Sequence, residues 1–326
     1  MRGENLFDNE ASFSLFTIDI PYIPINARWS QNGRTVAGGH GIGNKTNQLF
    51  WPHGIFVDDH QTMIIADHWN HRIVQWKMGD TDGQVVAGGN GQGNRSDQLD
   101  RPINVVIDKK TNYLIICDQK NRRVVQWSRN SGTIQGEILI DNIDCYGLCM
   151  DDDRYLYVSD TELHEVRRYG KGDKNGTIVA GRNGKGASLN QLNWPTYIFV
   201  DQQQAVYVSD SGNNRVMKWD KGATEGSIVA GGRGRGDALT QLSDPNGLFV
   251  DKLGTIYVAD SRNHRVMRWP KAANEGVVIT GENGAGAEPN QLNWPRGLSY
   301  DQQGNLYVVD YYNHRVQFIS IQKTKN

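Results

Sequence analysis

The chain has 326 residues, and its 35 lysines and arginines are balanced by 36 aspartates and glutamates, for a formal net charge of −1. This balance excludes a global attraction to nucleic acid or acidic lipid, so any such binding has to be local. No apolar run approaches the roughly 20 residues of a membrane span, and residues 1–26 lack a signal-peptide pattern. We therefore expect no membrane span, while the compartment stays open.

Residues 1–27 lie before the repetitive part of the sequence and show no clear periodicity. We expect a lead that is partly disordered or a remnant of an upstream segment, although Phe13 to Ile20 has some strand character. Residues 321–326 are expected to form a short polar tail.

Between these ends, one motif recurs six times. It begins with an aspartate, carries an arginine five positions later in every copy but the third, and ends with a large apolar or aromatic residue. The leading residues are Asp67, Asp118, Asp160, Asp210, Asp260 and Asp310, with spacings of 51, 42, 50, 50 and 50 residues. A fixed period of this length indicates stacked supersecondary units in one repeat domain.

Each unit contains four short runs rich in β-branched and aromatic residues, bounded by Gly, Asp and Asn. In the fifth unit these runs are 247–250, 255–259, 265–269 and 276–280. Their lengths and boundaries favour strands over helices. The sequence therefore predicts an all-β, six-bladed propeller with four-stranded blades.

A Gly-rich linker precedes most units, as in residues 37–52, and it is missing before the third unit, which explains the 42-residue interval. After Ile319 too few residues remain for a fourth strand, whereas Arg34 to Ala37 is a fourth strand without its first three. We predict that this N-terminal strand completes the sixth blade and so closes the ring.

The pattern Asp-x-x-Asn-His-Arg-Val, intact at 260–266 and 310–316, resembles the NHL-repeat family of six-bladed propellers. The resemblance covers about residues 28–320, and the third copy departs from it at Leu163-His164-Glu165. Because the Asp and Arg recur in nearly every copy, we interpret them as structural residues, with Asp capping a turn and Arg reaching a carbonyl or carboxylate of the adjoining blade.

An enzymatic function is less well supported by the sequence than a binding function. Amidating lyases resemble this family and hold zinc with histidines at the starts of inner strands, but here only His53 occupies such a position. Calcium-dependent lactonases need oxygen ligands there, and only Asn104 and Asn246 qualify. We expect no enzyme activity, no cofactor and no metal, with a lyase or lactonase as an alternative.

The preferred function is protein or peptide recognition on the propeller face that carries the linkers and the Asp-x-x-Asn-His-Arg loops, by a monomeric domain. RNA recognition on the same face is the alternative, although the basic residues of the linkers exceed the acidic ones by only two. The candidate binding residues are large or polar side chains at inner-strand starts and in loops. They are His53, Trp69, Asn104, Tyr146, Tyr197, Asn246, Arg296, Tyr311 and Tyr312. The alternative for the loop aromatics of blades one and six is that they only cover the seam where the ring closes.

Cys117 and Cys145 fall near the loop face of consecutive units, which leaves two alternatives. They form a disulfide if their Cα atoms lie within about 7 Å, or they are two buried thiols at small-residue positions.

Overall fold

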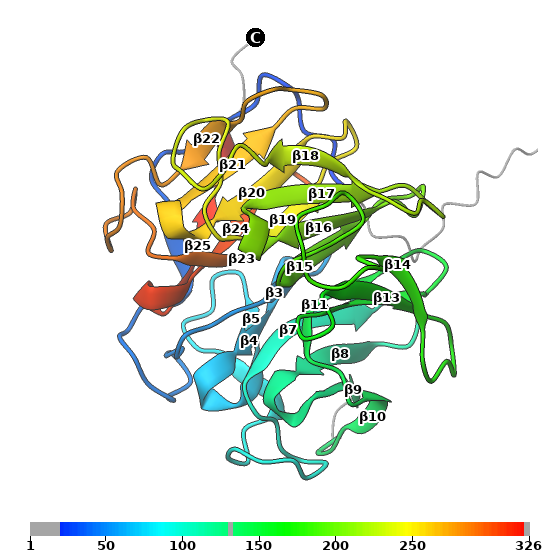
Figure 1. The fold of residues 1–326 in the computed structure, drawn as a ribbon. Helices are drawn as coiled ribbons and strands as arrows, with labels where there is room; N and C mark the ends of the chain where they lie inside the picture. The colour runs from blue at the N-terminus through cyan, green and yellow to red at the C-terminus, as the bar shows by residue number, and fades with distance from the viewer. Residues whose placement is uncertain (1–19, 130–132, 323–326) are drawn as a thin grey trace, which may run out of the picture.

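The computed structural model describes residues 20–129 and 133–322 and shows six four-stranded antiparallel sheets arranged around a central axis (Figure 1). The predicted all-β, six-bladed propeller is therefore confirmed. The segment 13–19, for which some strand character was noted, lies outside the described residues.

Each blade runs from an innermost strand at the axis to an outermost strand at the periphery, in sequence order for blades one to five. Blade one contains β3 (Ile55–Val57), β4 (Thr62–Asp67), β5 (Arg72–Lys77) and β6 (Gln84–Gly88). Blade two contains β7 (Pro102–Asp108), β8 (Tyr113–Asp118), β9 (Arg123–Ser128) and β10 (Glu137–Asp141). Blade three contains β11 (Cys145–Met150), β12 (Leu156–Asp160), β13 (Glu165–Tyr169) and β14 (Thr177–Ala180).

The second half of the ring repeats this arrangement. Blade four contains β15 (Pro195–Val200), β16 (Val206–Asp210), β17 (Arg215–Trp219) and β18 (Ser227–Gly231). Blade five contains β19 (Pro245–Val250), β20 (Ile256–Asp260), β21 (Arg265–Trp269) and β22 (Val277–Thr280). Blade six contains β23 (Pro295–Tyr300), β24 (Leu306–Asp310) and β25 (Arg315–Ile319).

The fourth strand of blade six is β2 (Arg34–Gly38), which pairs antiparallel with β25. The predicted closure of the ring by an N-terminal strand is therefore confirmed. A second contact between the ends joins β1 (Arg28–Trp29) to β26 (Ile321–Gln322), so a strand begins within the segment expected to be a polar tail. The lead also packs on the ring, because Ile23 is fully buried against Gly304.

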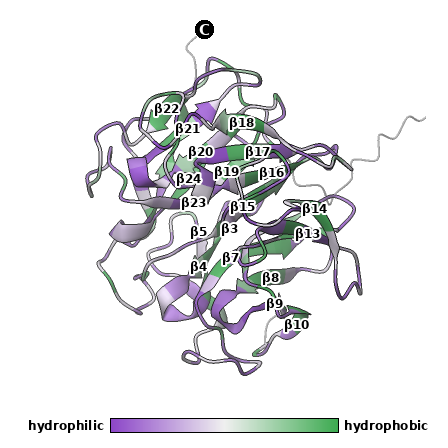
Figure 2. Ribbon diagram, in the orientation of Figure 1, coloured by the Kyte–Doolittle hydropathy of each residue, from purple (hydrophilic) through white to green (hydrophobic). Residues whose placement is uncertain are grey.

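Apolar residues concentrate on the strands, and polar residues on the turns between them (Figure 2). The core fills the spaces between neighbouring blades, where third-strand tryptophans such as Trp76, Trp219 and Trp269 are buried. Burying one such side chain stabilises the fold by a few kcal/mol. The sheets therefore form a rigid ring, and the linkers and turns lie on its two faces.

The recurring Asp and Arg form one clamp per blade that fastens the preceding linker to the ring. In blade one, buried Asp67 accepts hydrogen bonds from the Phe50 amide (2.8 Å) and from Arg72 Nε (2.7 Å). The other guanidinium nitrogens of Arg72 donate to the carbonyls of Asn44, Lys45 and Gln48. Arg therefore binds the Asp of its own blade and the linker before it, and the expected contact with the adjoining blade was wrong.

Blade three is the exception, and its departures share one cause. No linker separates Asp141 from Cys145, so the blade has no linker carbonyls for an arginine to bind, and Glu165 stands in the arginine position. At this junction a disulfide joins Cys117 of β8 to Cys145 of β11, with a Cα separation of 5.8 Å. Of the two alternatives left open by the sequence, the structure therefore shows the disulfide and not a pair of buried thiols.

We expect removal of residues 1–38 to lower the free energy of unfolding by on the order of 5 kcal/mol. The deletion removes the buried Val36 and Ala37 and leaves the edge of β25 unpaired. Urea unfolding of the shortened chain measures the change. An unchanged transition midpoint would contradict closure by β2.

We expect the Cys117→Ala/Cys145→Ala variant to lose about 2–4 kcal/mol of stability, because the bond closes a loop with a sequence separation of 28 residues. Cys149→Ala, which changes the free buried cysteine, is a control for the loss of thiol volume. Equal unfolding free energies for the wild type and the double variant would show that the bond contributes nothing.

Candidate functional site

The face that carries the linkers is called the loop face, and the axis opens onto it at the starts of the innermost strands. Neighbouring innermost strands pack closely here, since a Cβ added at Gly247 would lie 2.4 Å from the Arg296 carbonyl oxygen. The residues beside these strand starts therefore project into one small space around the axis.

Six side chains meet in that space and are called the axial cluster: His53, His68, Tyr146, Tyr197, Asn246 and Arg296. The rings of His53 and His68 are 4.5 Å apart, and His53 lies 6.0 Å from Tyr146. Tyr146 in turn packs edge-on against Tyr197 at 5.6 Å. Side chains from blades one, three and four thus converge on the axis.

Arg296 is the charged centre of the axial cluster. Its Nη1 donates to Asn246 Oδ1 (2.9 Å) and to the Tyr146 hydroxyl (3.2 Å), and the Tyr146 hydroxyl donates to the same Asn246 oxygen (3.2 Å). Within residues 20–129 and 133–322, no carboxylate forms an ion pair with Arg296. Because burial raises the pKa of Tyr146 and Tyr197, their hydroxyls stay protonated. The carboxylate of Asp244 acts electrostatically on the Arg296 guanidinium without forming a salt bridge to it.

The two histidines are neutral at physiological pH. Burial lowers the pKa of His68 to about 3 and that of His53 well below its ordinary value. His68 Nδ1 lies 3.2 Å from the Pro102 carbonyl oxygen, so it donates there and leaves Nε2 as an acceptor. His53 Nδ1 is buried and has no hydrogen-bond partner in the described part of the chain.

Beside the axial cluster, six aromatic residues form a continuous surface that is called the aromatic patch: Phe50, Trp51, Trp69, Trp294, Tyr311 and Tyr312. Trp51 stacks on Tyr311 at 5.7 Å and meets Trp69 edge-on at 5.0 Å. Arg101 lies over Trp69, and Tyr312 is 45% exposed. Tyr311 connects the patch to the axial cluster through its contact with His53 at 5.0 Å.

The aromatic patch lies across the seam where the ring closes, between blade one and blade six. The position of Trp51, directly before a proline, is occupied by Arg101, Trp194, Asp244 and Trp294 in other linkers. In each of these linkers the residue has a positive φ, and its amide donates to a His or Asn of the preceding blade, as Trp51 does to His314. The backbone arrangement is therefore conserved within the ring, whereas the side chain is free to vary.

Most of the residues expected at the site come together. His53, Tyr146, Tyr197, Asn246 and Arg296 share the axial cluster, and Trp69, Tyr311 and Tyr312 belong to the aromatic patch. Asn104 lies apart, because its Oδ1 accepts from the Val105 amide and its side chain lines the axial channel farther down.

Sequence reasoning missed Phe50, Trp51, His68, Arg101 and Trp294. Trp51, Arg101 and Trp294 each precede a linker proline. An alignment of the linkers shows that this position varies in residue type and lies on one face. His68 could have been found by aligning the residue that follows each leading Asp, because His68 and Tyr311 are the only ring-bearing residues at that position. The other copies have Gln119, Thr161, Ser211 and Ser261 there.

Within the described residues, no group of three or more His, Cys, Asp or Glu side chains is placed to hold a metal ion. No helix in the same part of the chain is long and apolar enough to cross a membrane.

We expect the stability of the protein to fall as pH falls from about 6.5, because the unfolded chain takes up protons at His53 and His68 that the folded state excludes. The folded pKa values are depressed, so this contribution is present above pH 6.5 and declines by up to about 1.4 kcal/mol per pH unit for each histidine. In the His68→Gln variant this position has the glutamine that blade two has as Gln119. The variant should lose about 2 kcal/mol less unfolding free energy than the wild type between pH 6.5 and 5. Denaturant unfolding of the wild type and the variant between pH 6.5 and 5 tests this expectation. If the unfolding free energy of both depends on pH in the same way, the expectation is wrong.

Comparison with known proteins supports the fold. A sequence model described as the NHL repeat matches residues 242–268 and 292–317. No curated protein matches the sequence.

Among solved structures, an auxiliary nutrient binding protein from Bacteroides thetaiotaomicron has a TM-score of 0.71 and 15% identity, covering 91% of this chain and 77% of that one. A gluconolactonase from Xanthomonas campestris has a TM-score of 0.62 and 14% identity, covering 93% of this chain and 99% of that one. Virginiamycin B lyase from Staphylococcus aureus has a TM-score of 0.54 and 13% identity, covering 85% of this chain and 97% of that one. At these identities the likeness concerns the fold alone, and the chain is a six-bladed β-propeller in which residues 242–268 and 292–317 match the NHL repeat.

Proposed function

We propose that this chain is a non-enzymatic binding module that captures a protein or peptide segment on the loop face, at the aromatic patch and the axial cluster. The observation that carries the proposal is the partly exposed aromatic surface that adjoins a guanidinium whose hydrogen-bond partners, Tyr146 and Asn246, are both neutral. Tryptophan, tyrosine and arginine gathered on a rigid surface are the usual components of an interface hot spot.

The charge of Arg296 specifies part of the ligand. A half-buried guanidinium that has only neutral hydrogen-bond partners favours a carboxylate, which it binds with charge-assisted hydrogen bonds. The aromatic patch beside it suits an apolar or aromatic side chain. We therefore assign a peptide segment that presents a carboxylate, either an acidic side chain or a free C-terminus, next to an apolar residue.

Two observations favour this ligand over RNA. Several basic residues of the linkers are already engaged, since Arg95 pairs with Asp97 and Arg235 donates to Ser243. The aromatic rings of the patch contact one another, as Trp51 and Tyr311 do, rather than standing separately for bases to stack between them. Proteins of similar fold include an auxiliary nutrient binding protein as well as a gluconolactonase and a lyase, so the proposal rests on the site and not on these neighbours.

We expect Trp51→Asn and Trp69→Lys each to weaken peptide binding at least about tenfold while thermal unfolding stays nearly unchanged. Asn tolerates the positive φ of Trp51, and Lys is the residue of blade two at the position of Trp69. The ligands are peptides selected on the wild-type protein from a display library with free C-termini, and affinity is measured by calorimetry.

Trp194→Asn is the matched control for Trp51→Asn. Trp194 occupies the same linker position, also has a positive φ, and is 49% exposed in blade four, away from the aromatic patch. Its replacement should leave peptide affinity unchanged. Peptides that bind both Trp51→Asn and Trp69→Lys as tightly as the wild type would refute the site, as would a large loss of stability in these variants.

We expect blocking of the peptide carboxylate as an amide to weaken binding to the wild type by about tenfold or more, and to have little effect on Arg296→Met. The methionine keeps most of the side-chain length and removes the charge. If amide and carboxylate peptides bind the wild type equally, Arg296 does not recognise the ligand.

A further inference from the structure

A second cavity lies at the axis on the face opposite the loop face. It has a volume of about 260 Å³ and is lined by the innermost strands of all six blades together with Ile20 of the lead. The turns at its mouth follow the ends of these strands, for example at Asp201 and Asp301, whereas the axial cluster lies at their starts. The mouth of the cavity therefore lies on the opposite face from the proposed peptide site, and Tyr197 of the axial cluster also lines the cavity.

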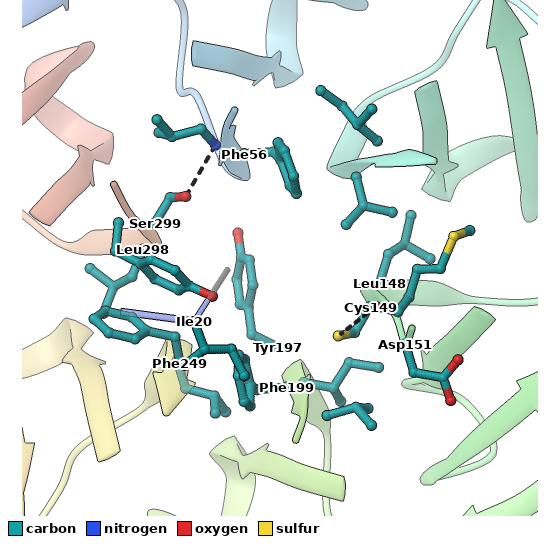
Figure 3. Close-up of a pocket in the computed structure, with 18 of the residues that line it drawn as sticks. Ile20, Phe56, Leu148, Cys149, Asp151, Tyr197, Phe199, Phe249, Leu298 and Ser299 are labelled. Atoms are coloured by element: carbon teal, nitrogen blue, oxygen red, sulfur yellow. Dashed lines mark hydrogen bonds between the residues drawn. The ribbon is translucent and has the colours of Figure 1, made fainter. Parts of the chain in front are cut away.

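The wall of this cavity is apolar. Phe56, Leu148, Phe199, Phe249 and Leu298 surround it, as Figure 3 shows. An apolar cavity of this size is smaller than the sites that hold drug-sized molecules, so it suits a small hydrophobic body. Burial of such a body in the cavity is favourable by about 25 cal/mol for each Å² of apolar surface removed from water.

Tyr197 reaches into the inner end of the cavity (Figure 3). Its side chain is 6% exposed, and its hydroxyl has no hydrogen-bond partner among the described residues. A buried hydroxyl without a partner costs roughly 1–3 kcal/mol, which a ligand atom that accepts or donates a hydrogen bond would recover.

The mouth of the cavity is strongly acidic. The lining includes seven aspartates and one lysine: Asp58, Asp59, Asp151, Asp152, Asp153, Asp201, Asp301 and Lys109. Lys109 pairs with Asp59, and Arg129 lies 3.5 Å from Asp58. In contrast, Asp151, Asp153 and Asp301 accept hydrogen bonds from uncharged Gln, Asn or Tyr groups, which leave their negative charge in place.

The lead of this chain is a poor occupant for the cavity on charge grounds. Ile20 already lies in the wall, but residues 1–19 carry Arg2 against Glu4, Asp8, Glu10 and Asp19. An acidic segment would be repelled by an acidic mouth, whereas a cation would be attracted to it.

We infer that this cavity binds a small amphipathic amine, with its apolar body against the channel wall and its ammonium group among the aspartates of the mouth. The hydroxyl of Tyr197 is available at the inner end for a polar atom of the ligand. The aspartates of the mouth take no part in the peptide binding proposed for the loop face, and Tyr197 is the residue that the two sites share.

Three probes that share one apolar body and differ only in charge test the inference: 4-phenylbutylamine, 4-phenylbutanol and 4-phenylbutanoate. Calorimetry with the full chain should show one bound amine per chain at concentrations up to about 1 mM, with the alcohol about tenfold weaker and the carboxylate not bound. Raising the salt concentration should weaken the amine more than the alcohol.

The exposed Asp152 and Asp153 provide the decisive variant. Asp152→Asn/Asp153→Asn should weaken the amine at least about fivefold and leave the alcohol unchanged. The control Asp220→Asn/Asp237→Asn makes the same change of net charge outside this cavity and should alter neither. Tyr197→Phe tests the inner end of the cavity independently and should leave folding intact. Among the amines, it should alter the binding only of those with a polar group at the phenyl end, such as 4-(4-hydroxyphenyl)butylamine.

Equal affinity for amine and alcohol would overturn the inference, as would an amine affinity that the control variant lowers as much as Asp152→Asn/Asp153→Asn does. Binding of the amine only after residues 1–19 have been removed would also overturn it, because it would identify the lead as the occupant.

Discussion

The buried ion pair between Asp and Arg in the repeat is the interaction on which the loop face depends. Each pair, such as Asp260 with Arg265 at 2.8 Å, also fixes linker carbonyls that would otherwise lack partners. Breaking one such buried pair typically costs about 3–5 kcal/mol, because the remaining charge stays desolvated. The clamp therefore holds a Gly-rich segment, which has little intrinsic preference for one conformation, in a fixed position on the rigid ring. Recognition residues on that segment are pre-organised as a consequence.

The junction between blades two and three has no Gly-rich linker, and the residues of the clamp differ there. Arg122 occupies the position at which most other blades have a His or Asn that accepts from the next linker, and it pairs with Glu162 instead. Glu165 replaces the clamp arginine, and the disulfide between Cys117 and Cys145 connects the blades directly. The irregular spacing, the altered motif and the disulfide thus all occur at the one junction that lacks a Gly-rich linker.

The fold could be predicted in detail because it follows from local patterns that repeat. The repeat period gives the number of blades, and the four strand-like runs give the strands in each blade. The isolated strand around Arg34 indicates how the ring closes. The candidate site could be predicted from the sequence only in part. His53 and Arg296 occupy equivalent repeat positions, so the topology places them near one axis. The pairing of His53 with His68, and the stacking of Trp51 on Tyr311, depend on side-chain directions across blades that no sequence spacing specifies. The channel wall is invisible in the sequence for the same reason, since its residues look like ordinary core positions.

The two faces of the ring differ in charge and in what they offer a ligand, and both depend on the same rigid scaffold. We infer that the clamps immobilise the loop face one linker at a time. Native-state hydrogen exchange of the Arg265→Gln variant measures this immobilisation. We expect the amides of Gln241 and Ser243, in the linker that Arg265 holds, to exchange at least about tenfold faster, while those of Gln191 and Asn193, in the linker held by Arg215, keep their protection. Unchanged exchange at Gln241 and Ser243, or equal acceleration in both linkers, would contradict the account.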